Sequence, residues 1–214
     1  MSWLHVFDLD GTLLRESTAS LEIAGVLGSR AALLEMEDRF ALGRATTQMF
    51  AAELLALWDL LDDDAVEQAF VNAPWIEGIA RVLADITARG EHTMLVTMSP
   101  MFFADRARRF GFEHVVASQF PELPFREPLN PSHILEPQDK VAAVRARLRE
   151  LDLDVCRVTA CGDSMSDEPL FAQLRHTVAV NATPALASLA ECTYVGTNLW
   201  AAYCTARAAM ARRS

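Results

Sequence analysis

Apolar residues follow two different spacings along the chain, and the spacing changes near residue 75. The opening run "WLHVFDL" (residues 3–9) is almost continuously apolar, which predicts a strand buried on both faces, as in a parallel sheet. From about residue 18 to residue 73, apolar positions recur every three or four residues instead, which predicts helices and no strand. These helices are expected in "LEIAGVLG", "RAALLEMEDRFALG", "TTQMFAAELLALWDLL" and "DDDAVEQAFVNA".

Beyond residue 75, short apolar runs alternate with segments of helical spacing. Strands are predicted in "HTMLVT", "HVVA", "CRVTACGDS", "TVAVN" and "TYVG". Helices are predicted in "EGIARVLADITARG", "SPMFFADRARRFG", "DKVAAVRARLREL", "SDEPLFAQL" and "TPALASLA", and from about Leu199 onward. This alternation predicts an α/β fold built on a doubly wound parallel sheet, with the earlier helical block inserted after the first strand.

Composition narrows the class of protein. The 214 residues carry a net charge of −10, which argues against a nucleic-acid surface because phosphate backbones require stripes of Lys and Arg. No apolar stretch is long enough for a membrane span. The four cysteines lack metal-ligand spacing, so we expect reduced thiols, mostly in the core. The first residues enter a strand without a basic region or cleavage site, so we expect a cytoplasmic protein, either a monomer or a homodimer.

Acidic residues gather where predicted strands end. Because the carboxyl ends of parallel strands share one edge of the sheet, residues following different strands meet in one crevice. Thr97 supplies a hydroxyl at the end of another predicted strand, and Lys140 opens a predicted helix, so we expect both in the same crevice. Clustered carboxylates are costly unless a hard cation binds them, and Mg²⁺ prefers oxygen ligands. The set comprises Asp8, Asp10, Thr97, Lys140, Asp163 and Asp167.

The lysine side of this crevice suits a phosphate. Ser99 is a plausible N-cap and Pro100 a plausible first residue of the following helix, whose free N–H groups would face an anion beside Thr97. Ser166 could likewise cap the helix after "GDSMSD" and place Asp167 in its first turn. A carboxylate can attack a phosphoryl group whose charge is neutralised, and a neighbouring acid can protonate the leaving alkoxide.

Four short motifs carry a family resemblance. "DLDGTLL" at Asp8, the Thr97 that precedes "MSP", Lys140, and "GDSMSD" from Asp163 to Asp167 resemble the ordered motifs of the haloacid dehalogenase (HAD) superfamily. The helical block resembles the C1-type cap of its phosphoserine-phosphatase-like branch. The resemblance implies a Rossmann-like core over residues 1–15 and 75–214 and a helical cap over residues 16–74.

The resemblance also implies roles for individual residues. Asp8 would be the nucleophile, and Asp10 the general acid and base that also offers Mg²⁺ its backbone carbonyl. Thr97 would bind phosphoryl oxygens and Lys140 would pair with Asp8. The implied metal ligands are Asp8, Asp10, Asp163 and Asp167. The expected substrate-binding residues are Gly11, Thr12, Thr97, Met98, Ser99, Lys140 and Glu16.

The function implied is that of a Mg²⁺-dependent phosphomonoesterase acting on a small phosphorylated metabolite. A phosphotransferase or mutase using the same aspartyl phosphate, and a non-catalytic phospho-ligand binding protein, remain alternatives. Ser17, not Glu16, stands at the spacing where phosphoserine-specific relatives carry a substrate-binding Glu, so phosphoserine is not implied as the substrate. Contacts of Arg39, Arg44 and His133 with substrate are left open.

Overall fold

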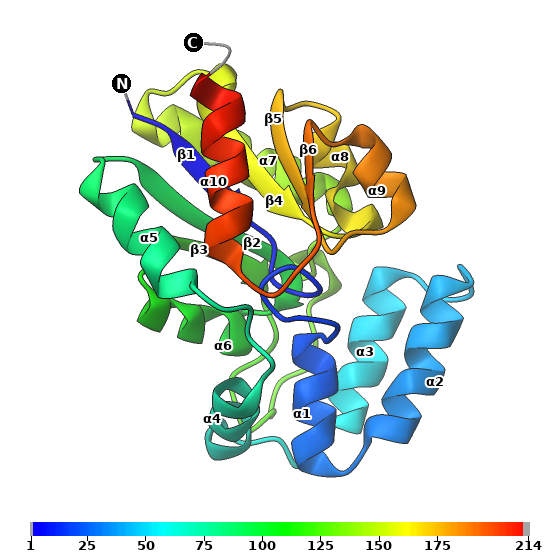
Figure 1. The fold of residues 1–214 in the computed structure, drawn as a ribbon. Coiled ribbons are helices and arrows are strands. Elements are labelled where there is room, and N and C mark those ends of the chain that lie inside the picture. The colour runs from blue at the N-terminus through cyan, green and yellow to red at the C-terminus, as the bar shows by residue number, and fades with distance from the viewer. Residues whose placement is uncertain (1, 212–214) are drawn as a thin grey trace.

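A six-stranded parallel sheet forms the centre of the molecule (Figure 1). The computed structural model describes residues 2–211. The strands follow the order β3-β2-β1-β4-β5-β6, which puts β1 between β2 and β4. Their bounds are β1 Leu4–Phe7, β2 His92–Pro100, β3 His114–Ser118, β4 Val158–Gly162, β5 His176–Val180 and β6 Cys192–Tyr194. The doubly wound α/β fold predicted from the sequence is confirmed.

Each face of the sheet is covered by its own helices. Successive side chains of a strand point to opposite faces, so Leu4 and Val6 enter one apolar cluster and Phe7 the other. The cluster around Val6 includes side chains of α7 (Pro137–Leu151), α8 (Glu168–Phe171) and α9 (Pro184–Leu189). The cluster around Phe7 includes side chains of α5 (Ile79–Ala88), α6 (Met101–Ala104) and α10 (Leu199–Ala211).

Four helices separate β1 from α5 and lie below the sheet in Figure 1. They are α1 (Ala19–Leu27), α2 (Arg30–Ala41), α3 (Thr47–Leu57) and α4 (Asp63–Asn72). The chain leaves and re-enters the body through two paired segments, where the Arg15 N–H donates to the Pro74 carbonyl at 3.0 Å and the Ile76 N–H to Leu13 at 2.8 Å. The boundaries expected at residues 16 and 74 lie beside this pairing.

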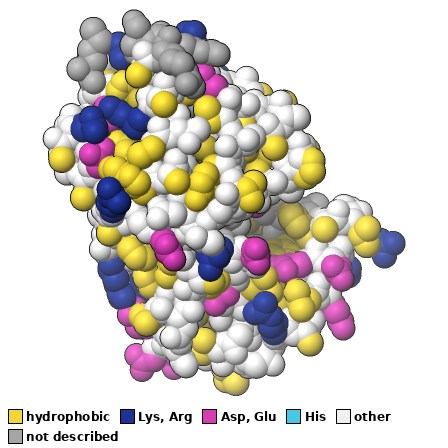
Figure 2. Space-filling view, viewed as in Figure 1, with side chains coloured by type: hydrophobic (Ala, Val, Ile, Leu, Met, Phe, Trp, Pro, Cys, Tyr) yellow, Lys and Arg dark blue, Asp and Glu magenta, His cyan; other side chains and the backbone are white. Residues whose placement is uncertain are grey.

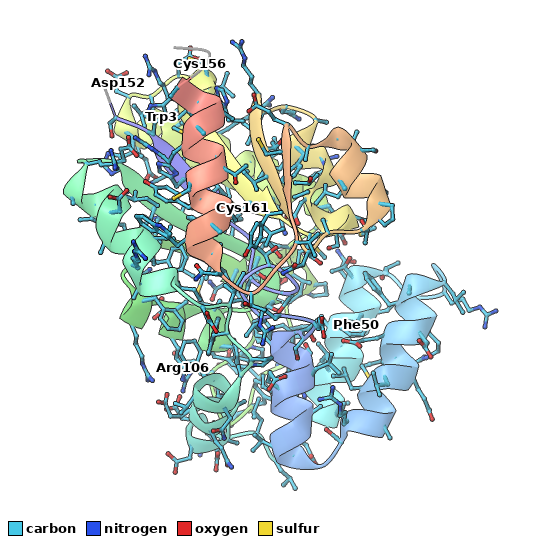
Figure 3. All side chains as sticks on the ribbon, viewed as in Figure 1. Trp3, Phe50, Arg106, Asp152, Cys156 and Cys161 are labelled. Atoms are coloured by element: carbon cyan, nitrogen blue, oxygen red, sulfur yellow. The ribbon has the colours of Figure 1, made fainter. Side chains whose placement is uncertain are left out.

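Helix α4 fastens the insertion to the body. Asp62 caps α4, its carboxyl accepting from the Ala65 N–H at 2.8 Å. Arg106, in the 3-10 helix that follows α6, donates to Asp63 at 2.6 Å and to Glu67 at 3.1 Å (Figure 3). Trp58, fully buried after α3, packs edge-on against Phe102 of α6. These contacts hold the insertion over the carboxyl edge of the sheet.

Two expected helix starts are wrong. Strand β2 continues through Ser99 to Pro100, so Ser99 does not cap a helix, and α6 has only four residues before it tightens into the 3-10 helix Asp105–Phe110. The hydroxyl of Ser99 donates to Asp10 instead. Ser166 does not cap the next helix either, because Ser164 forms the capping box with Asp167. In both places the serine hydroxyl instead bonds to a charged side chain, Asp10 for Ser99 and Lys140 for Ser166.

The cysteines are less buried than expected. Cys161, in β4, is buried and Cys192 is partly buried, but Cys156 and Cys204 are exposed. Cys156 lies in a short turn before β4 and Cys204 on the outer face of α10. Among residues 2–211, no helix combines the length and the apolar character that crossing a membrane requires.

Candidate active site

The strand order brings the acidic residues of the sequence motifs together. The Asp8 N–H donates to the Cys161 carbonyl at 3.0 Å, which extends the β1–β4 pairing up to the first aspartate. Asp163 follows directly after β4. Oxygen atoms of Asp8, Asp163 and Asp167 lie within 4.8 Å of one another. The predicted crevice therefore exists at the carboxyl edge of the three central strands.

The side chain of Lys140 bonds to two carboxylates of this cluster. It lies in the first turn of α7, where Glu136 and Asp139 form a capping box, and it is the only lysine in the chain. The fully buried ammonium donates to Asp8 at 2.7 Å, to Asp167 at 2.8 Å and to Ser166 at 3.0 Å. Burial opposes its charge, but the two carboxylates outweigh burial and raise its pKa.

Asp163 differs from the other acids of the cluster in its hydrogen bonding. Asp163 Oδ1 is buried and has no hydrogen-bond partner within the described part of the chain. Burial, followed by the charge of Asp167, raises the pKa of Asp163 to about 7. Burial also raises the pKa of Asp8, against the opposing effect of Lys140. A divalent cation beside Asp163 Oδ1 would satisfy the orphan oxygen and relieve this repulsion, so the residues fit Mg²⁺.

Asp167 is arranged differently from the other acids. Its Oδ1 accepts from Lys140 and its Oδ2 accepts from the Asp163 N–H at 3.1 Å. The carboxyl lies so close to Gly162 that a Cβ there would be 2.4 Å from Oδ2. Glycine is therefore required at this position, and Asp167 is suited to orienting Asp163.

Asp10 joins the body to the inserted helices. Its Oδ1 accepts from the N–H of Ala19, the first residue of α1, at 2.7 Å, and its Oδ2 accepts from the Ser99 hydroxyl. Burial raises the pKa of Asp10, and these two hydrogen bonds counteract part of that effect. The carboxyl is thus held by partners other than Lys140 and is poised to exchange a proton.

Three expected phosphate contacts face a cavity. Thr97, Met98 and Ser99 line a cavity of about 310 Å³ that also reaches Asp8 and Asp10. Thr97 is buried, and its oxygen accepts from the Ser99 N–H at 3.1 Å, which leaves its hydroxyl proton for a ligand. Figure 2 shows the surface hollowed where the body meets α2 and α3.

The structure does not bring every expected residue to this cavity. Gly11 lies against the carboxyl of Asp163, and Thr12 is fully buried beneath the turn after β1. Glu16 is exposed, at a positive φ of 52°, and does not line the cavity. Its neighbour Ser17 is buried and donates to Glu22.

The residues left open by the sequence also lie outside the cavity. Arg39 is exposed and pairs with Glu53 of α3. Arg44 is exposed in the loop before α3. His133 is exposed in the Pro-rich loop, near the amide of Asn130. None of the three lines the cavity.

Sequence reasoning missed the outer wall of the cavity. The start of α1, helices α2 and α3 and the loop after β3 supply it, with side chains that a helical pattern assigns to ordinary packing or solvent. The wall residues are Thr18, Ser20, Glu37, Phe40, Thr47, Phe50, Ala51, Leu54, Phe120 and Ile134. Only the tertiary contact between insertion and body distinguishes them from neighbouring residues of the same type.

A family model described as haloacid dehalogenase-like hydrolase matches residues 5–172. The chain belongs to this hydrolase family. Its matched region contains Asp8, Lys140 and Asp163, the residues that the structure gathers at the sheet edge. A search of curated proteins finds no match.

Solved structures share the fold of this HAD-family chain. A substrate-bound phosphoserine phosphatase is 17% identical with a TM-score of 0.79, over 94% of this chain and 96% of the other. A phospho-aspartyl intermediate analogue of phosphoserine phosphatase is 18% identical with a TM-score of 0.78, over 94% and 96%. A HAD family hydrolase from Salmonella enterica subsp. enterica serovar Typhi is 17% identical with a TM-score of 0.82, over 94% and 70%. At these identities the likeness concerns the fold.

Proposed function

We propose that this protein is a Mg²⁺-dependent phosphomonoesterase that hydrolyses a small phosphorylated metabolite through an aspartyl phosphate on Asp8. The observation that carries the proposal is the buried Asp8–Lys140 pair at 2.7 Å, next to the orphan oxygen of Asp163. A buried carboxylate that is held in place by a neighbouring ammonium group is suited to attack a phosphoryl group. The family match and the similar fold of a phosphoserine phosphatase in its phospho-aspartyl analogue form support the same chemistry.

In the proposed first step, a carboxylate oxygen of Asp8 forms a bond to phosphorus while the bond from phosphorus to the ester oxygen breaks. Asp10 gives its proton to the departing alkoxide. Thr97 donates its hydroxyl to a phosphoryl oxygen, and Lys140 fixes the orientation of Asp8. Asp8, Asp163 and the backbone carbonyl of Asp10 would hold Mg²⁺, which neutralises charge between the carboxylate and the phosphate.

In the second step, water attacks the aspartyl phosphate and gives its proton to Asp10, which restores the acid and releases phosphate. The raised pKa of Asp10 suits this exchange, because a carboxyl that titrates nearer neutrality can hold and return a proton. Helices α2 and α3 cover the cavity, which favours small substrates and restricts bulk water.

The test is phosphate release from p-nitrophenyl phosphate with added Mg²⁺. Asp8→Asn should abolish turnover, and Asp163→Asn should raise the Mg²⁺ concentration required for half-maximal rate. Asp64→Asn changes an exposed acid on α4 and should leave both unchanged. Full activity of the Asp8→Asn variant would refute the nucleophile assignment.

Two further measurements separate the alternatives. Acid-quenched wild-type protein should carry one added phosphoryl group by intact mass, and Asp8→Asn should not. Adding candidate acceptor alcohols should leave free phosphate as the product, whereas phosphorylated alcohol would identify a phosphotransferase. Ligand binding without turnover on any ester would identify a binding protein.

A further inference from the structure

One wall of the cavity combines a carboxylate with aromatic rings. Glu37 and Phe40 of α2 and Phe50 of α3 line this wall, and Figure 3 shows Phe50 on the part of α3 that faces the α/β body. The ring centroids of Phe40 and Phe50 are 5.3 Å apart. Apart from the catalytic acids, Glu37 is the only charged side chain among the described residues that line the cavity.

Glu37 is held in place but is not neutralised. Thr18 donates to Glu37 at 3.3 Å, and the same hydroxyl oxygen accepts from the Leu21 N–H at 3.1 Å, which directs its proton toward the carboxyl. Within residues 2–211, this is the only hydrogen bond to Glu37. No Lys or Arg lines the cavity in the same part of the chain. Arg30 of the same helix acts on Glu37 only through its charge, without a hydrogen bond or ion pair among the described residues, so this half-buried carboxylate has no cationic partner at the cavity wall.

We propose that the cavity accepts phosphate esters of small amino alcohols, with the substrate ammonium group against Glu37 and the rings of Phe40 and Phe50. This inference rests on the proposed phosphatase function. The phosphate of such an ester meets Thr97 beside the Asp8–Lys140 pair, and the ammonium supplies the positive charge that Glu37 lacks. Aromatic rings add a favourable interaction with a partly desolvated cation.

The same geometry selects against carboxylate-bearing esters. A carboxylate next to the ester would enter a wall that offers it hydroxyl and apolar side chains, no cation from the described residues, and the negative charge of Glu37. Phosphoserine carries such a carboxylate, and ethanolamine phosphate is the same molecule without it. We therefore expect this protein to prefer a different substrate from the phosphoserine phosphatases whose fold it shares.

The experiment compares matched esters on wild-type and Glu37→Gln protein with Mg²⁺ present. The first pair is choline phosphate and its uncharged isostere, in which a tert-butyl group replaces the trimethylammonium group. The second pair is ethanolamine phosphate and phosphoserine. Glu35→Gln, an exposed change on the same helix, is the matched control. The readouts are kcat/KM for each ester and, by calorimetry in the Asp8→Asn background, the Kd of each ester.

Wild type should favour the charged member of the first pair by about 10- to 30-fold, the range expected for a partly desolvated cation against aromatic rings and a carboxylate. Glu37→Gln should reduce that ratio most of the way to one, and Glu35→Gln should retain it. Equal kcat/KM and equal Kd for both members, or a ratio unaffected by Glu37→Gln, overturns the inference. Absence of turnover with the Kd ratio intact overturns only the phosphatase proposal.

Discussion

Replacing Lys140 with methionine tests whether the lysine is what allows two acids to stay buried side by side. Methionine nearly preserves the volume of the side chain but removes donors to Asp8 at 2.7 Å and to Asp167 at 2.8 Å. A charge pair at 4 Å is worth about 4 kcal/mol at an effective dielectric constant near 20, before the cost of dehydrating the lysine is subtracted. Removing one partner of a buried pair typically costs about 3–5 kcal/mol, which is the loss of unfolding free energy we expect near neutral pH.

The loss should depend on pH in a definite direction. Burial already raises the pKa of Asp8, and Lys140 is the group that lowers it. Without Lys140 the folded pKa of Asp8 rises further, while the unfolded value stays near its ordinary value of about 3.9. The folded variant then retains a proton over the pH range where folded wild type has already released it, so the destabilisation relative to wild type grows as the pH rises between these two folded pKa values.

The assay is urea unfolding of metal-free protein at about pH 5 and about pH 8. Ser166→Ala is the control, because it removes only the uncharged third partner of the lysine and should cost about 1 kcal/mol at both pH values. Turnover of Lys140→Met should fall by at least about 100-fold. Equal stability losses for Lys140→Met at the two pH values would contradict the charge argument.

Other perturbations address packing, capping and a second buried cluster. Trp58→Ala should lower the free energy of unfolding by about 3–5 kcal/mol, because the side chain is fully buried. Trp58→Phe should lower it by less than about 1.5 kcal/mol. Similar urea midpoints for the two variants would argue against close packing around Trp58. Asp62→Ala should cost about 1 kcal/mol by thermal unfolding through loss of the α4 cap, and no change would mean that the cap hydrogen bond is replaced. Burial lowers the pKa of His5 despite its hydrogen bond to Glu91, so the free energy of unfolding should decline as the pH falls below about 6.5. His5→Gln should flatten that decline in urea titrations. An unchanged dependence of the unfolding free energy on pH would point to other groups.

Much of the fold followed from the spacing of apolar residues. The strand ending at Phe7 and the helices of the insertion appear where periodicity predicts them, because each buries one stripe or one face and depends little on distant partners. The carboxylates at Asp8 and Asp163 could be placed for a related reason. Parallel strands put their carboxyl ends at one edge, so position in the chain determines position in the crevice.

The expectations that failed involve side chains with two competing partners. The local pattern predicts that Ser99 and Ser166 cap helices, yet Asp10 and Lys140 are their partners. Glu37 on α2 could not be distinguished from other acids of the same helix, since its importance depends on Thr18 and on the body lying opposite. Contacts between segments distant in sequence leave no local trace in the pattern of residues.

The single lysine also gives this protein an unusual reporter. Its ammonium is fully buried between Asp8 and Asp167, so an amine-directed acylating reagent cannot modify that side chain in the closed, folded molecule. Acylation at this one position would record only those moments when the crevice opens or α7 detaches. Peptide mass spectrometry of the residue over time would therefore measure the opening of the catalytic centre without any engineered label.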